Sequence, residues 1–211
     1  MKTEELIREL ASETLGPVVP ISQALNRALW LGLAASSVLF GAILQPRADL
    51  GAAIDSGALL FKFGFALSLV VTTAVLLPHL ARPLPIVRWN PLLLLPPLVL
   101  AAGIMIELLT VPEGEWAGRL TGHHAARCLA LIPLISAPTL ACLLFSLRRG
   151  APAHPAAAGV VAGLVSGGIG TLLYSLSCRN DSPLFVATWY TLANVLLACA
   201  SAYLGKRLLR W

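Results

Sequence analysis

Two cysteines, Cys128 and Cys178, have the neighbours that make a thiol reactive. Each lies beside an arginine, Arg127 or Arg179, and a nearby positive charge favours the thiolate, the reactive form of cysteine. His124 lies four residues before Cys128, so on a helix the imidazole and the thiol would share one face. Two thiols suit a disulfide, and thiolate with imidazole suits a soft metal ion. Both chemistries stay open. So does the alternative of isolated surface residues, because no C-x-x-C or H-x-x-x-H spacing is present.

Lys62 and Glu107 are ionisable residues that fall inside otherwise apolar runs. Each lies about one helical turn from the same end of its run. A charge inside a membrane is costly unless it is paired, hydrated or close to the interface. The shared depth leads to the hypothesis of a Lys62–Glu107 ion pair. The alternative is that both side chains extend to the interface.

The elements that position these residues are predicted to be membrane-spanning helices. The chain is 57% hydrophobic and only 12% charged, too little polar material to cover the surface of a soluble domain. Its apolar runs are long enough for a hydrocarbon core of about 30 Å, where a lone backbone segment satisfies its hydrogen bonds as a helix. The predicted spans are 28–44, 58–77, 91–111, 125–147, 156–176 and 184–204. The predicted fold class is therefore all-α, a polytopic bundle of six transmembrane helices (residues 27–211) behind a short cytoplasmic N-terminal segment (residues 1–26).

Basic residues set the expected orientation. Ten lysines and arginines lie on one side of the predicted bundle, in the two terminal segments and in the connections after the second and fourth spans. Only Arg47, Arg119 and Arg179 lie clearly on the other side. The positive-inside rule then places both termini in the cytoplasm. Cys128 and Cys178 fall on the outer side, which is the oxidising periplasm if the protein lies in a bacterial inner membrane. The basic residues form short clusters rather than one continuous patch, so direct nucleic-acid binding is not expected.

The N-terminal segment is predicted to contain a short amphipathic helix. Leu6, Ile7 and Leu10 would form its apolar stripe, and Gly16-Pro17 would end it. Four glutamates, Glu4, Glu5, Glu9 and Glu13, lie in the same segment. Anionic lipid would repel such a helix, so a groove on a partner protein is the better binding surface. The alternative is that the helix docks onto its own bundle.

Two further patterns bear on packing and on the class of protein. Gly159, Gly163 and Gly167 recur every four residues in the fifth run, which indicates close helix packing, within the bundle or between two copies. The sequence has no G-x-S-x-G, H-E-x-x-H or phosphate-binding loop, so no enzyme activity is predicted. A small transporter or metal-efflux protein is the alternative function. It would need polar residues along the bundle, where Asn194 is the main one.

Stretches at the start, in the middle and at the end of the chain together resemble a known family. They are the start M-K-T-E-E-L-I-R-E-L-A, the L-R-R-G-A-P around Arg148, and the C-R-N-D-S-P-L-F-V-A-T-W-Y-T-L from Cys178, with the ending L-G-K-R-L-L-R-W. They resemble the NrsF-type membrane anti-sigma factors of proteobacteria. The resemblance implies that an extracytoplasmic-function (ECF) sigma factor is held inactive at the inner membrane and released under heavy-metal or oxidative stress.

The resemblance also assigns roles to residues. Cys128 and Cys178 match the two outer-side sensing cysteines of the family, and the N-terminal segment with Leu6, Ile7 and Leu10 would bind the sigma factor. No obligatory cofactor is implied, only transient binding of a heavy metal. The expected mechanism is a two-state change: modified thiols alter the packing of the last three spans, and the N-terminal segment then releases its partner.

Overall fold

The computed structural model describes residues 20–55, 57–82, 91–122 and 125–209, and these residues are helices and their connections, with no strand among them. Six helical segments are long and apolar enough to cross a membrane. They are α2 (Ile21–Ile43), α4 (Ala58–Leu80), the 3-10 turn η1 (Pro91–Leu94) with α5 (Leu95–Thr110), α7 (Ala125–Leu147), α8 (Pro155–Ser175), and a last span composed of α9 (Pro183–Phe185), the π-helix η2 (Val186–Tyr190) and α10 (Thr191–Leu208). The prediction of an all-α bundle with six spans is confirmed.

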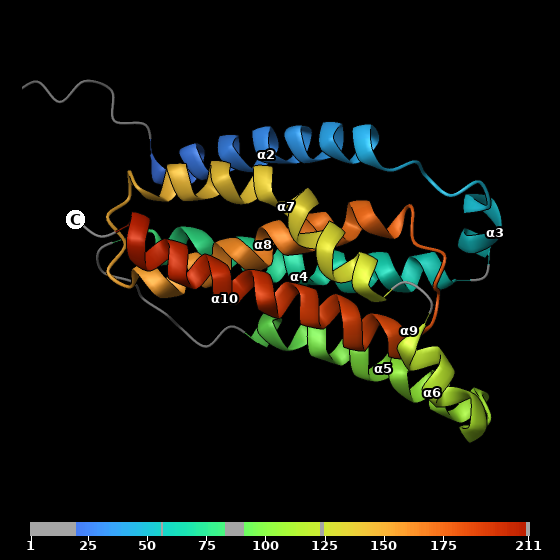
Figure 1. Ribbon diagram of the computed structural model, residues 1–211. Helices are drawn as coiled ribbons and strands as arrows, with labels where there is room; N and C mark the ends of the chain where they lie inside the picture. Colours follow the sequence, from blue (N-terminus) through green and yellow to red (C-terminus); the bar gives the residue numbers. More distant parts are fainter. Residues whose placement is uncertain (1–19, 56, 83–90, 123–124, 210–211) are drawn as a thin grey trace, which may run out of the picture.

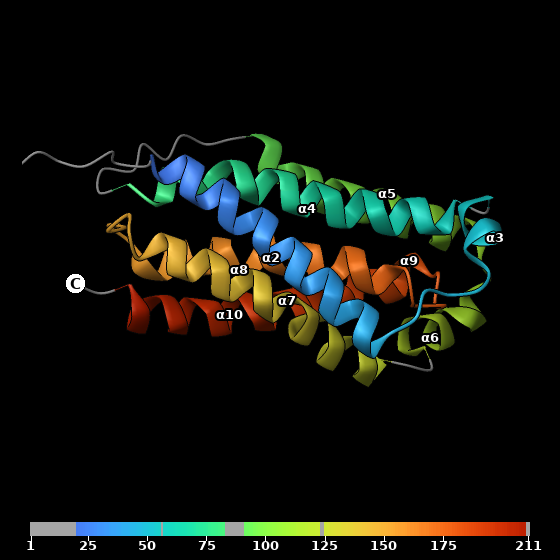
Figure 2. The same ribbon diagram turned by 90° about the horizontal axis from the view of Figure 1, so that it is seen from above.

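The long helices run side by side along one axis, and two short helices lie at one end of the bundle (Figures 1 and 2). The short helices are α3 (Leu50–Asp55) and α6 (Glu113–Thr121). We call this end the α6 end. The described chain begins and finishes at the opposite end, which we call the terminal end (Figure 1). An even number of spans returns the chain to the side from which it started.

Helix boundaries differ most from the predicted spans at the terminal end. α2 begins at Ile21, within the predicted N-terminal segment, and α10 continues to Leu208. The extra turns carry polar or basic side chains such as Arg27 and Arg207, which an apolar-run criterion excludes. A helix can continue through such residues at the membrane interface. In α10, Arg207 lies in the last turn, where a positive charge stabilises the helix.

The glycine stripe of α8 packs within the bundle. A Cβ at Gly159 would collide with the Ser201 carbonyl oxygen of α10, and a Cβ at Gly163 would lie 2.6 Å from the Ser201 hydroxyl oxygen. A Cβ at Gly167 would collide with the Asn194 side chain. These three glycines therefore let α8 and α10 approach closely, which confirms packing within one chain as their role.

Prolines act differently in the third and fourth spans. Pro133 and Pro138 lie inside α7, and α7 bends along its length (Figure 1), as expected where a ring replaces an N–H. Pro96 and Pro97 of the third span do not lie in the interior of a helix. Instead they occupy the first turn of α5, directly after the 3-10 turn, where a missing N–H leaves no helical hydrogen bond unmade.

Candidate thiol site

Cys128 and Cys178 come together inside the α6 end of the bundle. Cys128 lies in the first turn of α7 and is fully buried. Cys178 follows the end of α8, where the Tyr174 carbonyl accepts bonds from the backbone N–H groups of Ser177 (3.0 Å) and Cys178 (3.1 Å). Both cysteines are free thiols, and their side chains interact with each other. The topology thus brings together two residues that lie 50 positions apart in the sequence.

Aromatic side chains enclose the two thiols. The Cys128 Sγ donates a hydrogen bond to the Tyr174 hydroxyl at 3.3 Å. The Tyr174 ring meets the Tyr190 ring edge-on at 5.9 Å between centroids, and Phe185 packs on Tyr190 in the same way at 6.2 Å. Tyr190 belongs to the π-helix and is fully buried, and its hydroxyl has no hydrogen-bond partner among the described residues. π-Helical turns occur often at functional sites, and this one turns an aromatic ring toward the thiols.

Two cations hold the loop that carries Cys178. The fully buried Lys62 of α4 donates from Nζ to the Asp181 carboxylate at 2.6 Å and to the Cys178 carbonyl at 3.0 Å. Arg47, which follows α2, donates to the same carbonyl at 3.3 Å and to Asp181 at 2.9 Å. Arg47 also binds Asp49 at 2.7 Å. The loop is therefore fastened to both α4 and the α2–α3 connection.

This charge cluster changes the acidity of its members. Burial opposes ionisation of Asp181, but the hydrogen bonds from Arg47 and Lys62 outweigh it and hold the pKa of that carboxyl below its usual value. The hydrogen bond from Arg47 lowers the pKa of Asp49 in the same way. The interaction with the Cys128 thiol lowers the pKa of Cys178, and the positive charge of Lys62 adds to this, although burial opposes both. Cys178 is therefore the better nucleophile of the two cysteines.

Glu107 fastens the other end of the same loop. Its carboxylate accepts hydrogen bonds from the Ser182 hydroxyl at 2.8 Å and from the Leu184 backbone N–H at 2.7 Å. Arg119 of α6 adds an ion pair at 3.3 Å. Ser182 is also the N-cap of α9 and accepts from the Phe185 N–H. Glu107 thus fixes the start of the last span.

The hypothesis of a direct Lys62–Glu107 ion pair is wrong. Both side chains are buried, with exposures of 0% for Lys62 and 4% for Glu107, so neither side chain extends to the surface of the bundle. The loop between α8 and α9 folds inward between α4 and α5. It supplies Asp181 to Lys62, and Ser182 and Leu184 to Glu107. Each charge finds a partner on this loop rather than on the other helix.

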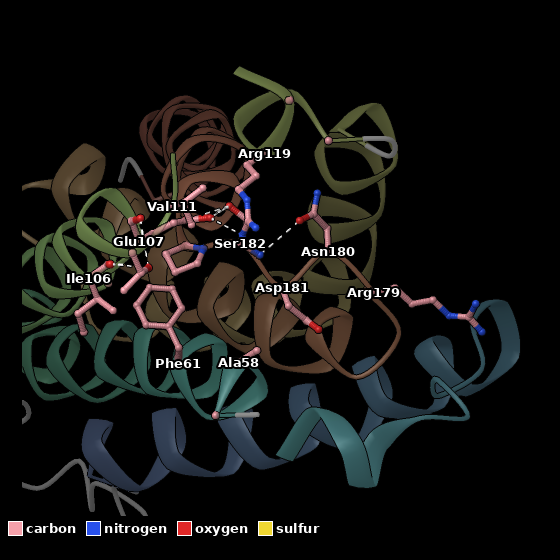
Figure 3. A pocket seen from close by; sticks show the side chains of 16 residues that line it. Ala58, Phe61, Ile106, Glu107, Val111, Arg119, Arg179, Asn180, Asp181 and Ser182 are labelled. Atoms are coloured by element: carbon pink, nitrogen blue, oxygen red, sulfur yellow. Dashed lines mark hydrogen bonds and ion pairs between the residues drawn. The ribbon is translucent and has the colours of Figure 1, made fainter. Parts of the chain in front are cut away.

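An open cavity of about 920 Å³ lies beside this loop. Figure 3 shows the Glu107 carboxylate directed toward Arg119 and Ser182, while Arg179 points away from them. Arg179 and Arg127 are both exposed. The cation that acts on the Cys178 thiol is instead Lys62, which is 116 residues away in the sequence. Sequence adjacency identified the wrong cation, and burial of a lysine within an apolar run was the useful signal.

Several predicted residues fall outside the described part of the chain. These are Leu6, Ile7, Leu10 and His124. Within the described residues, no group of three or more His, Cys, Asp and Glu side chains is arranged to hold a metal ion. The thiols therefore stand as a pair. Of the other two cysteines, Cys142 is half-buried and Cys199 is exposed on the bundle surface.

Comparison with known proteins gives one consistent result. The family model described as "Negative regulator of sigma F" (NrsF) matches residues 11–211. The chain is 34% identical over 214 residues to the "Probable anti-sigma-F factor NrsF" of Azospira oryzae, covering both chains completely. It is 33% identical over 217 residues to the "Anti-sigma-F factor NrsF" of Caulobacter vibrioides, again over both full lengths. No solved structure matches. The chain belongs to the NrsF family of negative regulators of sigma F.

Proposed function

We propose that this chain is an inner-membrane anti-sigma factor that binds an ECF sigma factor in the cytoplasm and releases it when Cys128 and Cys178 are modified. The two full-length relatives, both named as anti-sigma-F factors, support the first part. The observation that carries the second part is the pair of free, interacting thiols inside the α6 end. In this proposal the α6 end faces the periplasm and the terminal end faces the cytoplasm.

The chemistry proposed is oxidation of the pair by a hydroperoxide. The Cys178 thiolate attacks the terminal peroxide oxygen, the O–O bond breaks, and an alcohol or water leaves with the proton. The Cys128 thiol then attacks the resulting sulfenic sulfur, an S–S bond forms, and water leaves. Two thiols lose two electrons, which reduce the peroxide. The interaction between the two thiols favours a disulfide, whereas a bound metal ion needs further ligands.

The signal has a short physical route to the N-terminal segment. Cys128 lies on α7, and α7 packs directly against α2, where the Ser36 and Thr139 hydroxyls bond at 2.9 Å. A Cβ at Gly32 of α2 would lie only 2.6 Å from the Thr139 Cα. α2 begins at Ile21, so its terminal end leads straight into residues 1–19. We infer that a shift of α7 moves α2 and the segment attached to it, rather than acting only through the last three spans.

The cysteine part is tested with a reporter gene driven by the sigma factor. Cys128→Ser and Cys178→Ser should each abolish induction by hydroperoxide. Two variants serve as matched controls. Cys142→Ser lies on the same helix as Cys128, and Cys199→Ser lies in the last span; both should keep normal induction. Induction of the double variant at the wild-type level would refute the sensor role. Cadmium in a parallel arm separates metal binding from oxidation, because only oxidation leaves a Cys128–Cys178 disulfide.

The sigma-binding part is tested by co-purification of the sigma factor with the detergent-solubilised full chain. A variant carrying Leu6→Ala, Ile7→Ala and Leu10→Ala should lose the sigma factor, because the apolar stripe of the predicted helix would be gone. Replacing Glu4 and Glu5 by glutamine keeps that stripe and serves as the control. Full retention by the triple variant would assign binding to the connections that carry Arg82, Arg88, Arg148 and Arg149.

A further inference from the structure

Lys62 binds both a carboxylate and the backbone of the residue that carries a thiol. Its ammonium lies 2.6 Å from Asp181 and 3.0 Å from the Cys178 carbonyl, and its charge also acts on the Cys178 thiol. The side chain is completely buried. A buried ammonium is costly unless its charge is compensated, so the positive charge of Lys62 must be compensated by the groups around it.

The charged and titratable groups around Cys178 come from every element packed on it. Cys128 faces it from α7, Tyr174 from α8 and Tyr190 from the π-helix, while Lys62 approaches from α4. Arg47 and Asp181 complete the set. Arg47 has two carboxylate partners, Asp49 and Asp181. Lys62 has only Asp181 within ion-pair distance among the described residues, and it shares that partner with Arg47.

We propose that Lys62 is a positioning residue that activates Cys178, with its charge divided between Asp181 and the thiol, so that Lys62 promotes and Asp181 restrains the reaction of Cys178 with electrophiles. The part of the Lys62 charge that the Asp181 carboxylate does not neutralise stabilises the Cys178 thiolate. The biological meaning of this rests on the proposed sensor function, but the reactivity of the thiol can be measured without it.

The proposal makes an unusual prediction because Lys62 and Asp181 form one ion pair. If that pair only held the loop in place, losing either partner would loosen the loop and change the reactivity of Cys178 in the same direction. If the pair sets the thiolate charge, Lys62→Met should slow the reaction and Asp181→Asn should speed it. An opposite charge within about 4–6 Å shifts a pKa by about 1–3 units, so the midpoint of the pH profile should rise by at least about one unit in Lys62→Met and the rate below that midpoint should fall at least about tenfold. Both variants are compared below the midpoint, where the thiolate fraction limits the rate.

The experiment measures alkylation of Cys178 by iodoacetamide in the full chain with Cys142 and Cys199 replaced by serine. The thiolate attacks the methylene carbon, an S–C bond forms and iodide leaves, so the rate follows the thiolate fraction. Peptide mass spectrometry reports Cys178 separately from Cys128, and the rate is followed from about pH 3 to about pH 10, so that a midpoint lower than that of the original chain can be measured. Glu107→Gln is the matched control, since it weakens the other attachment of the same loop and should leave the midpoint of the pH profile unchanged.

The expected result is a higher midpoint for Lys62→Met, a lower midpoint for Asp181→Asn, and recovery toward the original profile in Lys62→Arg. Parallel changes in the first two, or no change in either, would overturn the proposal. If Lys62→Met does not fold, Asp181→Asn is compared with Glu107→Gln. A loosened loop would expose Cys178 and lower the midpoint in both variants, whereas the charge of Lys62 predicts a lower midpoint in Asp181→Asn only. Opposite shifts combined with normal reporter induction in the cysteine variants would leave this inference standing and refute the proposed sensor function.

Discussion

Replacing Gly32 by alanine should disconnect α7 from α2 without touching either thiol. A Cβ at this position would lie 2.6 Å from the Thr139 Cα and 3.1 Å from its Cβ and Cγ2. Carbon atoms pack best at about 3.5–4.0 Å, so the two helices must separate by about 1 Å. Such overpacking costs about 1–3 kcal/mol. The same movement would stretch the Ser36–Thr139 hydrogen bond from 2.9 Å beyond bonding range.

The sigma-dependent reporter measures the consequence. If the route from α7 to α2 carries the signal, losing about 1 kcal/mol of coupling should reduce the induction ratio at least about fivefold. Gly41→Ala is the control on the same helix, because a Cβ at Gly41 meets nothing within 4 Å. It should induce normally. The reasoning fails if Gly32→Ala is destabilised in detergent yet responds to hydroperoxide as well as Gly41→Ala does.

Two further predictions concern stability in detergent. Glu107→Ala should lower the free energy of unfolding by about 2–4 kcal/mol, since the Ser182 hydroxyl and the Leu184 N–H lose their acceptor and each unpaired buried donor costs about 1–3 kcal/mol. Glu115→Ala, which removes only the exposed partner of Arg119, should change it by less than about 1 kcal/mol. Equal effects in thermal unfolding would contradict the assignment. Asp181 has a lowered folded pKa, so its contribution is present above the unfolded pKa of about 3.9 and is lost as the pH falls through the folded value. Asp181→Asn should therefore flatten the dependence of thermal stability on pH below about pH 4, and an unchanged acid slope would speak against this ion-pair network.

The bundle could be predicted from sequence because a membrane span is set by length and apolar composition, which local residues report. The α7 boundaries, Ala125–Leu147, match the predicted fourth span for this reason. The π-helix at Val186–Tyr190 could not be predicted, because its residues are as apolar as those of an α-helix in the same place. Its effect, to turn Tyr190 toward the thiols, is visible only once the helices are packed.

The charged contacts were harder to predict from the sequence than the spans. The position of Lys62 and Glu107 along their predicted spans correctly indicated that both lie toward the same end of the bundle. That position does not show which groups a loop brings between two helices. The inward fold of the loop around Asp181 and Ser182 decided the pairing. In the same way, topology placed Cys128 and Cys178 on one side, while the cation acting on Cys178 came from a different helix.

The most direct test follows the amount of sigma factor held by the purified full-length chain as oxidant is added, with peptide mapping of the cysteines in the same samples. We expect the reduced protein to retain the sigma factor, and the bound amount to fall in step with formation of the Cys128–Cys178 disulfide. Cys128→Ser should retain it throughout. A disulfide that forms fully while the sigma factor stays bound would contradict the account.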